Sequence, residues 1–149
     1  MKGYKFKLEA VLKIRKLKEE QCKMEIGRIQ VEINKRKNDI KKHTAGIEQA
    51  YTSQEKLMED GVSGQEARFY PYFVSGKRAH INAVQNEIDD LQSDVNSKFE
   101  ELKILRGSVK VIDEMKEKDK IKYKKKIEKK QFEDIEEQVQ NWNQFQKEV

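Results

Sequence analysis

The sequence predicts an all-α protein, a long two-helix antiparallel coiled-coil hairpin with a short structured turn. Three observations predict this fold. Charged residues make up 40% of the 149 positions and apolar residues only 36%, which is too polar for a compact globule. Apolar residues recur at alternating spacings of three and four along two long stretches. The single proline and three of the seven glycines fall between those stretches.

The first stretch predicts one helix over about residues 5–58. Isoleucines stand at strict seven-residue intervals, which is the spacing of heptad a positions: Ile26, Ile33, Ile40 and Ile47. The accompanying d positions include Leu8, Cys22 and Leu57. Polar residues also fall in this seam, namely Arg15, Glu19, Arg36 and His43. Polar seam residues lower the stability of a coiled coil but fix its register and its choice of partner.

The second stretch predicts a helix over about residues 79–147. Its apolar seam runs from Ile81 to Ile112, and Lys98 is its one interruption. We expect the register to be lost for one or two turns after Ile112. It then resumes at Ile121, Phe132, Ile135, Val139 and Trp142. Residues 1–149 are therefore expected to form a single coiled-coil domain.

Residues 59–78 predict the turn region between the helices. Ser63 and Glu66 have the spacing of a capping box, which predicts a short helix starting at Ser63. That helix should kink or end near Tyr70, because the residue before a proline is disfavoured in helical conformation. Two apolar stripes joined by a short connection bury each other most easily as an antiparallel hairpin.

Charge is distributed unevenly along the chain. A turn centred near residue 68 would place Phe6 level with Gln131 and Ile26 level with Val111. Residues 1–23 carry eight basic and three acidic side chains, and residues 116–130 carry nine lysines and three acidic side chains. These segments would lie side by side, so the open end of the hairpin is predicted to be basic and to attract an acidic partner.

The apolar stripe continues beyond the part of the second helix that the first can face. Val139, Trp142 and Phe145 remain at near-heptad spacing in a section whose net charge is negative. An unpaired apolar stripe on a helix is typical of a segment that docks into a partner's groove. Fraying or folding back is the alternative interpretation.

No catalytic, metal-binding or cofactor-binding constellation is found in the sequence. The segment SGKR at residues 75–78 lacks the remaining elements of a phosphate-binding loop, and Ser75 is better interpreted as a helix N-cap. Two histidines are too few for a histidine-ligand cluster, so we interpret His43 as a polar seam residue and His80 as a solvated one. Cys22 falls in the seam. We therefore expect no enzymatic activity, no cofactor and no small-molecule substrate.

The lysine-rich run and an aromatic cluster near the turn each have more than one interpretation. The lysine-rich run at residues 116–130 would suit nucleic acid, although a solvated coiled-coil face has the same composition. An aromatic cluster comprises Phe69, Tyr70, Tyr72 and Phe73. This cluster closes the hairpin end as a small core, offers a binding surface, or does both. With no membrane-length apolar stretch and a single cysteine, the chain is expected to be cytoplasmic.

Residues 4–15, YKFKLEAVLKIR, resemble the F-x-L-x-x-V-L-x-x-R opening of the flagellar export protein FliJ family. The similarity continues through the long first helix, GVS at residues 61–63 with Glu66, and the Tyr/Phe pairs at residues 69–73. The chain departs from the family at its end, because residues 139–149 carry Trp142 with acidic flanks instead of a basic tail.

This resemblance implies a non-enzymatic rod of the flagellar type III export apparatus, similar to the central stalk of rotary ATPases. It implies binding to the hexameric flagellar export ATPase, promotion of its activity, and contact with the export gate membrane protein and export chaperones. The chain would then lie at the cytoplasmic face of the inner membrane through its partners. The alternatives are a stalk protein of a virulence type III secretion system, a basic nucleic-acid-binding hairpin, and a scaffold that dimerises.

The implied contact with the ATPase ring is placed at the open end. Its expected residues are Leu8, Leu12, Arg15, Lys125, Phe132, Ile135, Val139, Trp142 and Phe145. The expected residues for the export gate or chaperones are the aromatic ones around the turn: Tyr51, Phe69, Tyr72 and Phe73.

Overall fold

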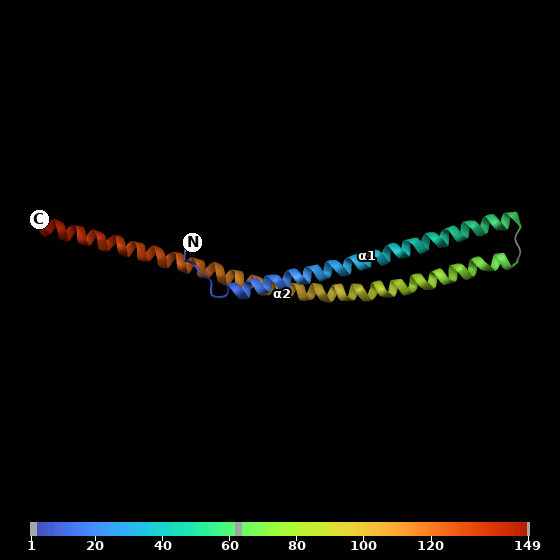
Figure 1. Cartoon of the computed structure of the whole chain (residues 1–149), viewed down its shortest axis with the longest axis horizontal. Coiled ribbons are helices and arrows are strands. Elements are labelled where there is room, and N and C mark those ends of the chain that lie inside the picture. The colour runs from blue at the N-terminus through green and yellow to red at the C-terminus, as the bar shows by residue number, and fades with distance from the viewer. Residues whose placement is uncertain (1–2, 62–63, 149) are drawn as a thin grey trace. The chain divides into compact units, whose positions relative to one another are not determined.

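The structure is a computed structural model that describes residues 3–61 and 64–148. Helix α1 spans Glu9–Asp60 and helix α2 spans Gly64–Glu148, and the described residues include no strand. Figure 1 shows α1 beside α2 along the paired part of the chain. Neither helix has an apolar stretch long enough to cross a bilayer within these residues. The all-α helical hairpin predicted from the sequence is confirmed.

The chain divides into two compact units. The terminal unit comprises Met1–Glu19 and Ile104–Val149, and the middle unit comprises Glu20–Lys103. Within each unit the contacts between α1 and α2 run in opposite chain directions, as in an antiparallel pair. The expectation of one coiled-coil domain over residues 1–149 stays a prediction.

The core of the middle unit is the aliphatic seam that the heptad spacing predicts. Four residues are buried in one cluster: Ile33, Val84, Ile88 and Val95. Ile29, Ile40 and Leu91 pack against them. Lys98 also lies in this seam, where its Nζ is 2.6 Å from Glu25 Oε2 and 3.2 Å from Glu101 Oε2. A charged residue is accommodated there because two carboxylates from the two helices receive its ammonium group.

The terminal unit has a smaller core. Leu12 is 1% exposed and packs with Val109 and Ile112, while Phe6 and Leu8 cover the cluster from the N-terminal segment. Burying a leucine side chain contributes on the order of 2 kcal/mol. This cluster therefore holds the start of α1 against α2.

The turn is much shorter than the predicted region 59–78, because α2 already begins at Gly64. Gly61 has a φ of 80°, which is the left-handed conformation that ends α1 after Asp60. Pro71 lies inside α2 at an exposed position, and its missing N–H removes one hydrogen bond from the helix. Ser63, the predicted cap, lies outside the described residues.

Tertiary packing explains why residues 64–78 are helical despite Pro71 and Gly76. Val74 is buried, and Tyr70 and Lys77 are half-buried on the same side of α2. The alternation of three and four thus begins well before Ile81 and continues into the aliphatic seam. Ser75 is inside the helix, so its interpretation as an N-cap is wrong.

The short turn also corrects the predicted register. A turn centred near residue 68 would place residue 22 opposite residue 115, whereas Cys22 Sγ lies 3.5 Å from the carbonyl oxygen of Lys98. Tyr4 contacts Asp119 and Tyr123 instead of residues near 133. The predicted levels of Ile26 with Val111 and Phe6 with Gln131 are therefore wrong. The part of α2 without a facing segment begins earlier than expected.

Candidate functional site

The N-terminal segment is anchored to α2 by Tyr4. Its hydroxyl donates a hydrogen bond to Asp119 Oδ2 at 2.9 Å, and its ring lies 5.2 Å from the ring of Tyr123. Partial burial, followed by the hydrogen bond to Asp119, raises the pKa of Tyr4 to about 12. Gly3 has a φ of 83°, and a Cβ there would meet the Tyr123 hydroxyl at 3.3 Å. The backbone conformation at this glycine thus lets the segment approach α2 closely.

Ion pairs and a backbone contact reinforce the same junction. Glu9 Oε2 lies 2.8 Å from Lys116 Nζ, and the hydrogen bond from Lys116 lowers the pKa of Glu9. Arg15 Nη1 donates to the carbonyl oxygen of Ser108 at 3.3 Å. Lys116 of the basic run and Arg15, one of the expected binding residues, therefore make contacts within the hairpin.

The nine residues expected at the ATPase contact fall into two groups. Leu12 is buried, and Leu8 and Arg15 are half-buried between α1 and α2. Leu12 and Leu8 belong to the core of the terminal unit, and Arg15 is bonded to Ser108, so these three residues contribute to the packing of the hairpin. The other six are exposed on α2: Lys125, Phe132, Ile135, Val139, Trp142 and Phe145.

The exposed group forms an uncovered apolar stripe on α2, here called the C-terminal stripe: Phe132, Ile135, Val139, Trp142 and Phe145. Their exposed fractions range from 51% to 62%. Every residue from 128 to 148 is exposed, and Figure 1 shows no other described segment beside this end of α2. The rings of Trp142 and Phe145 stack on each other at 6.3 Å. None of the described residues covers these five side chains.

The sequence pattern predicted that the seam resumes at Ile121 and continues through the C-terminal stripe. At Ile121 this prediction is wrong. Ile121, the expected first member of the resumed seam, is 53% exposed. The half-buried positions in this part of α2 are Lys116, Lys120, Tyr123 and Ile127. At 3.6 residues per turn, Phe132 and Val139 lie more than about 100° around α2 from Ile127, whereas Phe145 returns to the side of Ile127.

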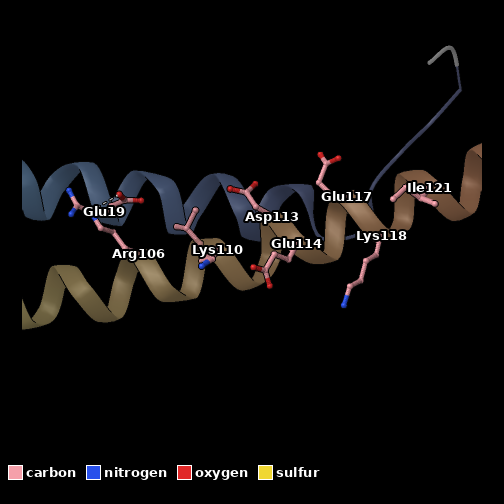
Figure 2. Close-up of a pocket in the computed structure, with 9 residues that line it drawn as sticks. Glu19, Arg106, Lys110, Asp113, Glu114, Glu117, Lys118 and Ile121 are labelled. Atoms are coloured by element: carbon pink, nitrogen blue, oxygen red, sulfur yellow. Dashed lines mark ion pairs between the residues drawn. The ribbon is translucent and has the colours of Figure 1, made fainter.

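A shallow groove of about 560 Å³ lies on the terminal unit above Val109 and Ile121. Figure 2 shows its charged rim, which includes Glu19 of α1 and Arg106 of α2, joined by an ion pair of 3.4 Å. The remaining rim residues come from α2: Lys110, Asp113, Glu114, Glu117 and Lys118. An open apolar floor with charges of both signs suits a peptide or helix better than a catalytic reaction.

The four aromatic residues expected at the gate or chaperone contact lie in two places. Phe69, Tyr72 and Phe73 line one groove of about 420 Å³ in the middle unit. Phe69 stacks on Phe73 at 5.9 Å, and Tyr72 is 83% exposed. Tyr51 lines another groove, where its hydroxyl accepts a hydrogen bond of 2.8 Å from Arg78 Nη2. The aromatic residues near the turn are mainly on the surface.

The structure also gathers residues that the sequence pattern did not connect. His43, which the spacing places in the seam, meets His80, and the two rings lie 4.2 Å apart with Asp39 beside both. The incorrect register hid this cluster, since it placed His43 level with residue 94. The Asp39–His43 spacing of four on one helix was the available signal.

These features define a class of protein: an all-α hairpin whose exposed apolar and charged surfaces suit association with other proteins. The model of the FliJ family, described as flagellar FliJ protein, matches residues 4–132. The chain therefore belongs to the FliJ family and is a flagellar, type III export-related protein. The family comprises non-catalytic export proteins, and membership implies interaction with components of the export apparatus.

No curated protein and no solved structure matches the chain. The matched range ends at Phe132, so it contains only the first residue of the C-terminal stripe. The family match thus covers the hairpin and its anchored N-terminal segment, but only the first residue of the stripe.

Proposed function

We propose that this chain is a cytoplasmic component of the flagellar type III export apparatus that binds the hexameric export ATPase and promotes its activity. In this proposal the chain also links the ATPase to the export gate and to substrate chaperones, at the cytoplasmic face of the inner membrane. The C-terminal stripe carries the ATPase contact, because its residues remain at least half exposed at the end of a long helix. A few residues carry most of the binding energy of a protein interface, and tryptophan, here Trp142, is enriched among them.

The basic run supports the stripe in this contact. Lys124, Lys125 and Lys126 are exposed on α2 just before the C-terminal stripe, whereas residues 131–148 carry five acidic side chains and one lysine. A partner surface with an acidic zone followed by a basic one would match this order of charges. Such complementarity speeds association and fixes orientation more than it raises affinity.

Affinity for the purified hexameric export ATPase tests the ATPase contact. Trp142→Ala should weaken binding by roughly tenfold or more and reduce stimulated ATP hydrolysis, because interface aromatic residues are frequent hot spots. Phe99→Ala is the matched control, since Phe99 is a 46% exposed aromatic residue of α2 in the middle unit. Equal affinity and equal stimulation by the two variants would contradict the ATPase assignment.

A truncation after Gln138 tests whether the last three residues of the stripe contribute together to ATPase binding. It removes Val139, Trp142 and Phe145 but leaves the anchored N-terminal segment and both cores intact. We expect binding to fall at least as far as in Trp142→Ala while the thermal unfolding midpoint of the hairpin is unchanged.

Lys125→Glu should mainly slow association with the ATPase, and raising the salt concentration should reduce the difference in association rate from wild type.

The proposed link to the gate or chaperones rests on the groove that contains Phe69, Tyr72 and Phe73. Tyr72→Ala should weaken binding to the cytoplasmic part of the export gate or to export chaperones and leave ATPase binding unchanged. Trp142→Ala should show the reverse pattern. Loss of both contacts in either variant would mean that the two partners share one surface, which would contradict this division.

A further inference from the structure

Side chains from both helices of the middle unit converge at a cluster of Asp39, His43 and His80. His43 Nε2 lies 3.3 Å from Asp39 Oδ1, and His80 Nε2 lies 3.2 Å from Asp39 Oδ2. One ligand atom from each of the three residues lies within 4.8 Å of the others. Asp39 and His43 are one helical turn apart on α1, and His80 comes from α2.

We propose that this cluster binds a divalent transition-metal ion of the Zn²⁺ type. Zinc bonds to imidazole nitrogen and carboxylate oxygen are about 2.0–2.2 Å long, so neighbouring ligand atoms in a tetrahedral site lie roughly 3.3–3.5 Å apart. The two histidine nitrogens lie 3.3 and 3.2 Å from different oxygens of Asp39, and the three ligand atoms lie within 4.8 Å of one another, so a small inward shift of the side chains would bring them to that edge. Two imidazoles and one carboxylate favour zinc and its neighbours over magnesium or calcium, which prefer oxygen ligands.

The surroundings give an ion access and leave room for a fourth ligand. The His43 side chain is 20% exposed, whereas those of Asp39 and His80 are 43% and 51% exposed. Both histidines line the groove of about 420 Å³ that also contains Phe73 and Lys77. An ion held by three protein ligands would therefore keep a solvent-facing position for water or for a partner's side chain.

Lys77 would compete with the ion for His43. Its Nζ lies 3.0 Å from His43 Nδ1, and because an ammonium group can only donate, Nδ1 accepts this hydrogen bond. The hydrogen of a neutral His43 ring is then on Nε2, the nitrogen that faces Asp39. Metal binding through Nε2 requires that hydrogen to move to Nδ1 and Lys77 to swing away. Removing the ammonium group should therefore strengthen metal binding, which a purely structural cluster would not predict.

A bound ion would connect the two helices of the middle unit. Asp39 and His80 are far apart in sequence and meet only in the folded pair, so an ion that needs both binds the folded state. Binding to the folded state alone raises the unfolding temperature. The ion would also rigidify one wall of the groove that contains Phe69, Tyr72 and Phe73.

Calorimetric titration of the chelator-treated full-length chain with zinc chloride tests this site. Wild type should bind one ion per chain, and His80→Gln and Asp39→Asn should each weaken binding roughly tenfold or more. Lys77→Met should bind more tightly than wild type. Asp94→Asn, which alters an exposed carboxylate of α2 outside the cluster, is the matched control and should bind as wild type does. With Co²⁺, wild type should show the visible absorption of a tetrahedral site.

The proposal is overturned if wild type binds no zinc, or if His80→Gln and wild type bind it equally. Circular dichroism of each variant establishes whether its helices are intact. If either His80→Gln or Asp39→Asn misfolds, the other variant still tests the site. Zinc should also raise the unfolding temperature of wild type but not of His80→Gln. An equal rise in both would indicate ion binding elsewhere on the chain and would likewise overturn this assignment.

Discussion

Two parts of helix α2 carry apolar stripes of the same kind, yet α1 covers only one of them. Along the middle unit, Val84, Ile88 and Val95 are buried against α1. Near the end of the same helix, Val139 and Trp142 are more than half exposed. The spacing of apolar residues therefore predicts an apolar helix face, but not whether the chain itself covers that face. The difference lies in the described facing segment, near whose N-terminal end Tyr4 meets Tyr123.

The largest expected contrast comes from placing the same charge in both stripes. Val95→Asp puts an unpaired carboxylate at a 2% exposed position and should lower the free energy of unfolding by about 3–5 kcal/mol. Val139→Asp places it at a 51% exposed position, where a change within about 0.5 kcal/mol is expected. Urea unfolding followed by circular dichroism measures both, and similar losses would mean that the stripe is covered in solution.

Lowering the pH should affect stability through carboxylates in the paired part of the hairpin, but not through those in the uncovered part of α2. This effect should be smaller than that of a charge placed in the core. The hydrogen bond from Lys98 holds the pKa of Glu25 below its ordinary value of 4.5. A lowered pKa contributes stability that is fully present above pH 4.5 and is lost as the pH falls through the folded-state pKa. The urea midpoint of wild type should therefore drop on acidification, and Glu25→Gln should flatten this drop. Glu133→Gln, in the uncovered part, should leave the profile as in wild type.

The smallest expected effect is at the boundary between the two parts, where Tyr4 contacts α2. Because the pKa of Tyr4 is raised to about 12, its stabilising contribution is present below pH 10.0 and lost as the pH rises through about 12. Tyrosinate absorbance of wild type should include a step near pH 12 that Tyr4→Phe removes. Tyr72→Phe should retain that step, and its loss there would show that Tyr4 is not the residue responsible.

Much of the fold could be predicted from the heptad spacing. Ile26, Ile33, Val95 and Ile112 are buried as the seam predicted, and even the seam residue Lys98 faces the other helix. Periodic spacing is a robust signal because each buried residue repeats the same information about one helix face. The type and extent of the helices follow from many residues at once.

The turn and the cross-helix pairs could not be predicted in the same way. Local rules treat Pro71 and Gly76 as helix breakers, but the burial of Val74 between them outweighs those preferences. The error in the turn then shifted every facing pair, which separated His43 from His80. Contacts between helices depend on a single register, and no repetition along the sequence corrects a mistake in it.

The connection of three residues between Asp60 and Gly64 also bears on how proteins of this family can vary in length. A residue inserted into one helix alone would shift the facing pairs between that point and the turn by one position. Seven residues gained in each helix at level positions would instead preserve the seam and its ion pairs. We expect evolutionary changes in the length of the paired region to occur as matched heptads, and changes beyond Tyr123 to be free of that constraint.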